Sequence, residues 1–488
     1  MNSACARNCC WLAAVTLLCT RGVDAQDYTA IDADLRAGTY GPVNSLLLQH
    51  RGEMVYEGYF RGSDSDDLQL LNSVTKSIGA TLIGIAERRG LLRTDESIAS
   101  LLPQYHWQAP ALAANAGISL DAILRMRHGI TWDEFTFGFT DPRNSAVQMF
   151  ASGDWYLNVL TRPRSASVGF TYSTGVSTLM SGVLRQRAGQ SPQQLFAQWL
   201  AQPLGIEHWD WELWSPQGPG SGQRSFPFDD APLGVGLWLR PRDLLKVGEL
   251  YLHDGRHAGQ RLLDAEWIAR SWTTYSDASS DAYFAGAEDF GYGQQWWFRA
   301  MIAADGERHA CWYANGAGRQ YLIVCPDDEL IVVSTGDSYS YSGPGVLTLL
   351  REQVLPALPR RISAALNGSY YEPASDGQGL QIEIFDAQQR AIAYWYTYNA
   401  SGEPRWYVLL GRIVDDEVQF EQILRAQGGR FRAGPAAQLP LVGNARLTWQ
   451  SCTQARLDYD FDQGSGSYPL QRLTGSCAAD HSPSASTR

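Results

Sequence analysis

The chain has 488 residues, which is long for one domain and favours two or three. Its hydrophobic content of 44% and charged content of 18% are those of a globular protein with enough apolar residues for a sizeable core. A net charge of −12, without any run of basic residues, excludes a surface built for nucleic acids or anionic membranes, so we expect no nucleic-acid partner.

Residues 1–25 have the pattern of a secretory signal peptide. Arg7 supplies a positive charge, residues 11–18 form a short apolar core, and residues 23–25 suit cleavage before Gln26. This pattern predicts export to the periplasm or the extracellular space. The apolar core is too short for a bilayer, and no later segment approaches the roughly 18 apolar residues that a span requires, so we expect no transmembrane segment.

Cleavage before Gln26 would leave four of the eight cysteines, an even number in an exported chain, which favours two disulfides. Cys311 and Cys325 flank Gly318 symmetrically on two predicted strands, so their side chains are expected to face each other across a hairpin. Cys452 and Cys477 would then form the second bond.

The sequence pattern predicts an α/β domain over residues 26–362. Its first element is a hairpin, with β-rich runs at 46–50 and 54–60 around a glycine turn. The middle is helical and loop-rich, and its clearest helices are expected at 120–126 and 177–187. A helix is expected to begin at residue 241. Four strands are expected after it, at 292–298, 310–314, 321–325 and 330–334. A last helix, over 346–355, precedes the prolines at 356 and 359.

The texture of the sequence changes after Pro359. Residues 366–478 consist of short β-rich runs separated by glycine turns and crowded with aromatic side chains, which predicts an all-β accessory domain. Most of these aromatics are expected in its core, and an aromatic surface contacting a glycan or another protein is the alternative. Residues 479–488 are rich in serine and predict a disordered tail.

Ser73 and Lys76 are the strongest candidates for chemistry. They lie three residues apart at the start of a stretch that is apolar on every side, typical of an enclosed helix, so their side chains can meet. The chain has 37 arginines and two lysines, and arginine cannot give up its proton to act as a base. The pair therefore predicts a serine nucleophile activated by a neutral lysine rather than a chance spacing.

Two further stretches fit the same kind of site. Tyr172 precedes a predicted helix and would project from a loop, although a buried tyrosine is the simpler interpretation. Residues 313–320 lie between two predicted strands, and their glycines would let a backbone edge approach a ligand. A plain hairpin turn is the alternative for this stretch.

The order of these motifs resembles the serine β-lactamase/penicillin-recognising superfamily, and within it the class C-related esterases and 6-aminohexanoate-dimer hydrolases. The resemblance rests on Ser73-x-x-Lys76, Tyr172-Ser173-Thr174 and Ala314-Asn315-Gly316, with supporting segments at 124–132, 204–206 and 240–244, and covers about residues 40–355. It implies an antiparallel sheet flanked by helices, with the active site between the sheet and a helical lobe.

In such a site Ser73 would be acylated, and Lys76 and Tyr172 would carry protons. The backbone N–H groups of Ser73 and Ala317 would form the oxyanion hole. Asn315, Gly316 and Arg319 would contact the substrate. Position alone suggests that an apolar pocket is lined by Phe135, Phe137, Phe139, Trp155, Trp209 and Trp211.

Two departures from the family pattern bear on the substrate. The third motif of β-lactamases usually carries a cation and a hydroxyl for the substrate carboxylate, whereas this chain has Ala314 there, with Arg319 as a substitute cation nearby. Thr174 replaces the asparagine that usually follows the tyrosine. Both changes spare the acyl-transfer groups and weaken the case for β-lactam turnover.

The sequence therefore predicts an exported serine hydrolase that cleaves a small carboxylic ester or amide through an acyl-enzyme. A β-lactamase or DD-peptidase and a non-catalytic binding protein are the alternatives. The eight histidines show no metal-ligand spacing, so we expect neither a metal nor another cofactor.

Overall fold

The computed structural model describes residues 28–212, 230–277, 290–304, 306–340, 342–358, 362–375, 377–428, 438–451 and 453–474. The predicted signal peptide, the tail from 479, Cys452 and Cys477 lie outside the described residues. Within the described ranges, no helix is both long and apolar enough to cross a membrane.

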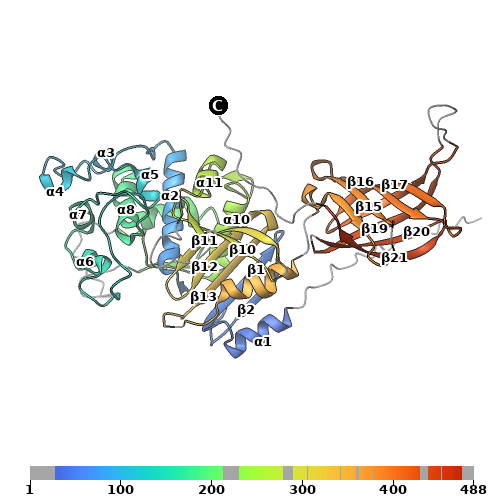
Figure 1. The fold of residues 1–488 in the computed structure, drawn as a ribbon. Helices are drawn as coiled ribbons and strands as arrows, with labels where there is room; N and C mark the ends of the chain where they lie inside the picture. Colours follow the sequence, from blue (N-terminus) through green and yellow to red (C-terminus); the bar gives the residue numbers. More distant parts are fainter. Residues whose placement is uncertain are drawn as a thin grey trace, which may run out of the picture.

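The first architectural unit is an eight-stranded antiparallel sheet (Figure 1). The hairpin of β1 (Val43–His50) and β2 (Glu53–Tyr59) forms one edge, and its turn places Arg51 and Gly52 at φ 51° and 81°. The sheet order is β2-β1-β13-β12-β11-β10-β9-β8. The strands after β2 are β8 (Ser276–Asp277), β9 (Phe290–Tyr292), β10 (Trp297–Ile302), β11 (Arg308–Gly316), β12 (Gln320–Cys325) and β13 (Leu330–Gly336).

The strand expected at 292–298 is interrupted. Gln295 has φ 60°, which breaks the ladder between β9 and β10. Its buried side chain donates to the carbonyls of Ile123 and Leu124 and accepts from the Ser177 hydroxyl, so long-range hydrogen bonds replace strand pairing here. The sequence pattern alone does not contain these contacts.

Helix α2 (Thr75–Arg88) lies between the sheet and the helical part of the molecule (Figure 1). All its residues from Thr75 to Ala86 are buried, as the all-round apolar sequence predicted. Helix α10 (Pro241–Leu252) packs on β13, β12 and β1. The remaining helices near the sheet are α1 (Thr29–Ala37), α11 (Ala265–Ser271) and α12 (Val346–Leu349), the last continued by a π-helical turn (Leu350–Val354).

The helices of the middle segment lie together on one side of α2, with the large sheet on its other side (Figure 1). Helix α8 (Thr174–Ala188) begins three residues earlier than expected because the Ser173 hydroxyl caps it by accepting from the Val176 N–H. The other helices are α3 (Ile98–Leu101), α4 (Pro110–Ala113), α5 (Leu120–Leu124), α6 (Ser145–Phe150), α7 (Trp155–Leu160) and α9 (Pro192–Phe196).

Two small sheets complete this part of the structure. In the first, β5 (Leu237–Leu239) pairs with β3 (Gln69–Leu70) and with β4 (Trp209–Trp211). Strand β3 runs directly into the segment that carries Ser73. The second consists of β6 (Arg256–His257) and β7 (Gln260–Arg261).

The C-terminal strands form a closed eight-stranded antiparallel barrel with its own hydrophobic core. Buried and exposed residues alternate along β15, as a barrel wall requires. Trp395, Tyr407 and Phe420 fill the interior, as expected for most of the aromatics. The strands are β14 (Gly368–Tyr371), β15 (Gly379–Phe385), β16 (Arg390–Tyr398), β17 (Pro404–Val414), β18 (Glu417–Arg425), β19 (Leu441–Ser451), β20 (Gln454–Phe461) and β21 (Gly464–Arg472).

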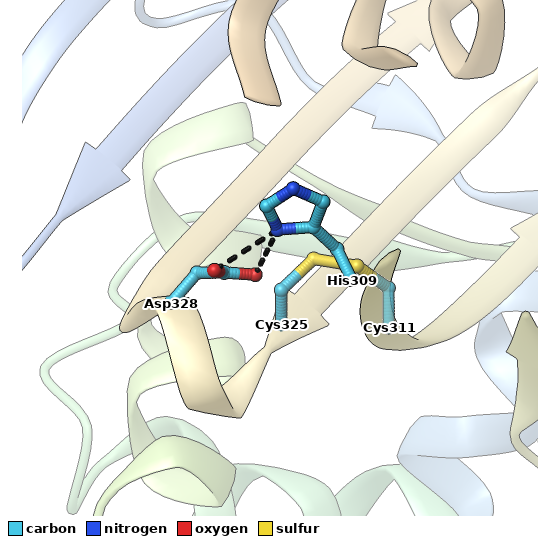
Figure 2. The surroundings of a disulfide bond; sticks show 4 residues. All are labelled: His309, Cys311, Cys325 and Asp328. Atoms are coloured by element: carbon cyan, nitrogen blue, oxygen red, sulfur yellow. Dashed lines mark hydrogen bonds and ion pairs between the residues drawn. A yellow bond between two sulfur atoms is a disulfide. The ribbon is translucent and has the colours of Figure 1, made fainter. Parts of the chain in front are cut away.

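A disulfide joins Cys311 on β11 to Cys325 at the end of β12, with an S–S distance of 1.98 Å. The two strands pair in antiparallel register next to it, which places the sulfur atoms face to face. Figure 2 shows the ring of His309 beside this bond, directed at the carboxylate of Asp328, with Nδ1 3.0 Å from both oxygens.

Candidate active site

The chain reaches Ser73 through a strained residue. Asn72 has φ 47°, in the left-handed region that asparagine tolerates better than most side chains. Its side-chain amide donates to the carbonyl of Ala317 at 2.8 Å and to the hydroxyl of Tyr339 at 2.9 Å. These bonds hold the turn (η1, Asn72–Val74) that presents Ser73 immediately before α2.

Lys76 lies in the first turn of α2 and is only 2% exposed. Its Nζ lies 2.9 Å from Ser73 Oγ, 3.0 Å from Thr174 Oγ1 and 2.8 Å from the carbonyl oxygen of Gly234. Burial lowers the pKa of Lys76 to about 8, and the negative charge of Glu134 partly opposes this shift. A lysine with such a pKa can accept a proton near neutral pH.

Tyr172 comes from the loop before α8 and lies against the amine of Lys76. The Lys76 Nζ is 4.8 Å from the centroid of the Tyr172 ring. The ring is held by Trp297, which stacks on it at 5.4 Å, and by Phe135 at 5.5 Å. The structure therefore brings together the three side chains that the sequence predicted as catalytic.

The end of β11 packs directly against the Ser73 turn. A Cβ added to Gly316 would lie 2.3 Å from the Leu71 carbonyl oxygen and 3.2 Å from the Ser73 nitrogen, so only glycine allows this approach. The next residue, Ala317, is exposed and is tied to Asn72 through its carbonyl. The two backbone segments predicted to form the oxyanion hole thus meet beside Ser73.

The other predicted substrate contacts divide into two groups. Asn315 is half-buried on β11, next to Gly316 and opposite Tyr321 on β12. Arg319 has φ 68°, and its guanidinium donates to the carbonyl of Gly343 at 2.9 Å and packs against Gly345. Arg319 is therefore engaged with the loop that follows β13.

The expected pocket of six aromatics does not form as a unit. Phe135 reaches the site, against Tyr172. Trp155 is buried against Phe150, Trp209 and Trp211 pack on Phe196, and the Phe139 side chain is 61% exposed. Position in the sequence was not sufficient here. Phe135, Phe137 and Phe139 lie in one loop, where the Arg143 guanidinium stacks on Phe137, whereas the three tryptophans belong to α7 and β4.

Glu134 is a site residue that sequence reasoning missed. It is 3% exposed and accepts from the Trp132 indole, from the Thr174 backbone N–H at 2.8 Å and from the Thr174 hydroxyl at 2.9 Å. The sequence contains it two residues after a segment already singled out, but no periodic pattern marks an acidic residue in a loop. Its one signal is that it lies two residues beyond the 124–132 segment.

Comparison with known proteins agrees with this geometry. Residues 35–337 match the model of the family described as Beta-lactamase, which is more than half of the chain. The chain belongs to the Beta-lactamase family of hydrolases. The predicted family and fold class are confirmed: an antiparallel sheet flanked by helices, and a C-terminal all-β domain, which the structure shows to be a closed barrel.

Individual relatives are distant. A 6-aminohexanoate-dimer hydrolase of Paenarthrobacter ureafaciens is 23% identical over 271 residues, which are 52% of this chain and 64% of that protein, so the chain spans just under two thirds of this relative. Two solved structures have a TM-score of 0.50: a D-stereospecific amidohydrolase from Streptomyces sp. (16% identity, 67% of this chain, 99% of that one) and a candidate 6-aminohexanoate-dimer hydrolase from Bacillus anthracis (14%, 64% and 77%). At these identities the structures establish the fold.

Proposed function

We propose that this protein is a serine hydrolase that cleaves a carboxylic ester or amide of a small molecule through an acyl-enzyme on Ser73. The observation that carries the proposal is the buried Lys76 amine, 2.9 Å from the Ser73 hydroxyl, with its pKa lowered to about 8 by burial. A serine hydroxyl becomes an effective nucleophile when an adjacent base removes its proton, and this amine is placed to do so.

The reaction would proceed in two halves. Ser73 Oγ attacks the substrate carbonyl carbon while its proton passes to Lys76, and Tyr172 returns a proton to the leaving alcohol or amine. Water then attacks the acyl-enzyme, with the same groups working in reverse. The backbone N–H groups of Ser73 and Ala317 would stabilise the oxyanion, a role supported by the close approach of β11 to the Ser73 turn.

The substrate class follows from the third motif. Ala314 is 1% exposed and uncharged, and the Arg319 guanidinium is engaged by the Gly343 carbonyl. Ala314 therefore offers no cation at the position where the superfamily usually meets a substrate carboxylate, and the Arg319 guanidinium contacts the loop after β13. This favours neutral esters and amides over β-lactams and D-alanyl peptides.

We also propose that the protein is exported, with a hydrolase domain over 26–362 and an all-β accessory domain over 366–478. Two separate hydrophobic cores support the division, the first ending at Leu358 and the second beginning at Ile362. The Cys311–Cys325 disulfide supports an oxidising compartment.

A fluorophosphonate probe tests the nucleophile. The purified protein should gain the mass of one probe adduct, and Ser73→Ala should gain none, because an alanine has no hydroxyl to react. Intact-mass spectrometry and peptide mapping measure the adduct, and circular dichroism shows that the variant is folded. A Ser73→Ala protein that labels and hydrolyses esters like the parent would refute the assignment.

A further inference from the structure

We propose that Glu134 is a positioning residue that fixes the direction of the hydrogen bonds around Lys76, so that the lone pair of the amine faces Ser73. The inference rests on the proposed serine-hydrolase function and adds a residue to it. Glu134 does not touch Ser73 or Lys76 directly; it acts through Thr174, whose hydroxyl lies 2.9 Å from Glu134 Oε1 and 3.0 Å from Lys76 Nζ.

The argument starts from the hydrogens of the amine. A neutral lysine has two N–H bonds and one lone pair, and Lys76 has three polar neighbours within 3.0 Å. The Gly234 oxygen is a carbonyl, so it can only accept, and it takes one N–H. The two remaining neighbours, Thr174 and Ser73, are hydroxyls that can either donate or accept.

Glu134 removes this ambiguity at Thr174. An ionised carboxylate only accepts, so the single proton of the Thr174 hydroxyl points to Glu134 Oε1. Towards Lys76 the Thr174 oxygen can then only accept, and it takes the second N–H. The lone pair is left for Ser73, whose hydroxyl donates to it. When the Ser73 O–H bond breaks, its proton forms the new N–H bond on Lys76 Nζ, whose lone pair faces the Ser73 hydroxyl.

The carboxylate itself is firmly placed. Glu134 Oε2 accepts from the Trp132 indole and from the Thr174 backbone N–H, which leaves Oε1 for the Thr174 hydroxyl. Because Thr174 begins α8, the positive end of the helix dipole also favours a negative charge at this point. The neighbouring Asp133 is turned the other way, with Oδ1 accepting from the backbone N–H groups of Phe135 and Thr136.

Glu134 also acts through its charge. In the described chain, the titratable groups near the Lys76 amine are Glu134 and Tyr172. The ring of Tyr292 meets the Tyr172 ring edge to face, with 6.4 Å between the ring centroids. On the side of Glu134 that accepts from the Trp132 indole, the guanidinium carbon of Arg162 lies 4.7 Å from the centroid of the Trp132 ring. The negative charge of Glu134 raises the pKa of Lys76 against the effect of burial, so its removal should lower that pKa below about 8.

The decisive variant is Glu134→Gln, which keeps size and can still accept from Trp132. The glutamine NH₂ would donate to the Thr174 oxygen and release the Thr174 proton, which then turns towards the Lys76 lone pair and competes with Ser73. We expect kcat for a p-nitrophenyl ester to fall by about 10- to 100-fold, a part of the roughly 10²- to 10⁴-fold that general-base catalysis contributes, because Lys76 itself is still present. The acid limb of the kcat/KM profile, near pH 8 in the parent, should move to lower pH.

Asp133→Asn is the matched control, because it removes a neighbouring carboxylate that is not directed at Thr174. Its acid limb should coincide with that of the parent. A purely structural disturbance would lower activity without lowering the pKa of the acid limb, so the pH profile separates the two explanations. Circular dichroism and thermal unfolding verify that each variant is folded.

Thr174 provides a second test that does not alter the charge. Thr174→Val removes the hydroxyl and keeps the shape, and should lower kcat to a similar extent, whereas Thr174→Ser should retain at least about ten times the kcat of the valine variant. Because Glu134 orients the amine through this hydroxyl, the Glu134→Gln/Thr174→Val double variant should be no slower than the slower single variant.

Additive losses in the double variant, or a Glu134→Gln enzyme with the kcat and acid limb of the parent, would overturn the inference. Ser73→Ala distinguishes this failure from failure of the proposed function. If the parent labels at Ser73 and needs it for turnover, but Glu134→Gln behaves like the parent, only the positioning role is wrong. If Ser73→Ala retains activity, the proposed function itself is wrong.

Discussion

Helices α2 and α10 each carry a lysine three residues after a polar partner, in the first turn of α2 and in the middle of α10, and the surroundings of the two amines differ. Lys76 follows Ser73, is 2% exposed, and contacts two hydroxyls and a carbonyl. Lys246 follows Asp243, its side chain is 29% exposed, and its Nζ lies 2.8 Å from the Asp243 carboxylate and 2.7 Å from the Gly205 carbonyl.

The comparison shows that spacing alone does not make a base. Lys246 forms an ion pair with a carboxylate at a partly exposed position, where a lysine contributes a structural contact. A lysine enclosed among neutral hydroxyls and a carbonyl loses hydration and gains only partial compensation from a carboxylate one hydroxyl away. Two features therefore distinguish a lysine suited to act as a base from one that forms a structural ion pair: the residue three positions before it and how deeply its amine is buried.

The largest expected effect is loss of turnover in Lys76→Arg. A guanidinium stays protonated at any working pH and cannot accept the Ser73 proton, so kcat for a p-nitrophenyl ester should fall by at least about 100-fold. Lys246→Arg is the matched control, since arginine can keep both the charge and the contact with Asp243, and its kcat should stay within about twofold of the parent. A Lys76→Arg enzyme within about tenfold of the parent would exclude the general-base role.

A third lysine, introduced by Ala314→Lys, tests the substrate preference. The unmodified protein should hydrolyse a short-chain p-nitrophenyl ester with a far higher kcat/KM than a chromogenic cephalosporin. A cation on β11 would form a charge-assisted hydrogen bond with the cephalosporin carboxylate, worth about 1.5–3 kcal/mol. The ratio of the kcat/KM values for the ester and the cephalosporin should therefore fall by about tenfold or more.

Ala314→Gln is the control for size without charge, and it should leave the ratio of the two kcat/KM values near that of the parent. Because position 314 is buried, thermal unfolding must show that both variants fold. Efficient cephalosporin hydrolysis by the unmodified protein would contradict the preference for neutral substrates.

The smallest expected effect on activity lies at the structural lysine. Lys246→Met removes one partly exposed ion pair, while Asp243 keeps its 2.7 Å contact with Arg240. The free energy of unfolding should fall by about 1.5–3 kcal/mol, since the buried Asp243 carboxylate loses one charge-assisted hydrogen bond and keeps the other, with esterase activity retained. Chemical denaturation measures the change, and a loss well above about 3 kcal/mol would show that Lys246 contributes more than this geometry implies.

Much of the fold could be predicted because its signals are local. The β1–β2 hairpin, the enclosed helix α2, and strands β11, β12 and β13 all arise from runs of residues whose period and turns can be recognised in sequence. The errors occurred where distant contacts decide the backbone. Gln295 breaks the strand expected at 292–298 because its side chain bonds to the end of α5 and to α8.

The candidate active site likewise has features that local sequence sets and features that distant contacts set. The sequence by itself determined the pair of Ser73 and Lys76, because residues three apart in a helical segment meet whatever surrounds them. It also predicted that the glycines of residues 313–320 would allow a close backbone approach to a ligand; for Gly316 the structure shows a close approach to the Ser73 turn instead. The chain's preference for arginine made Lys76 a candidate for a functional role.

Only the tertiary structure decided the surroundings on which the proposed role of Lys76 as a base depends. Its neighbours Thr174 and Gly234 lie 98 and 158 residues further along the chain, and Glu134 acts on it from a loop without periodic pattern. These are properties of packed elements: the burial of Lys76, the directions of the Ser73 and Thr174 hydroxyl protons, and the distance from the amine to a carboxylate. They exist only once the sheet, α2 and α8 have come together.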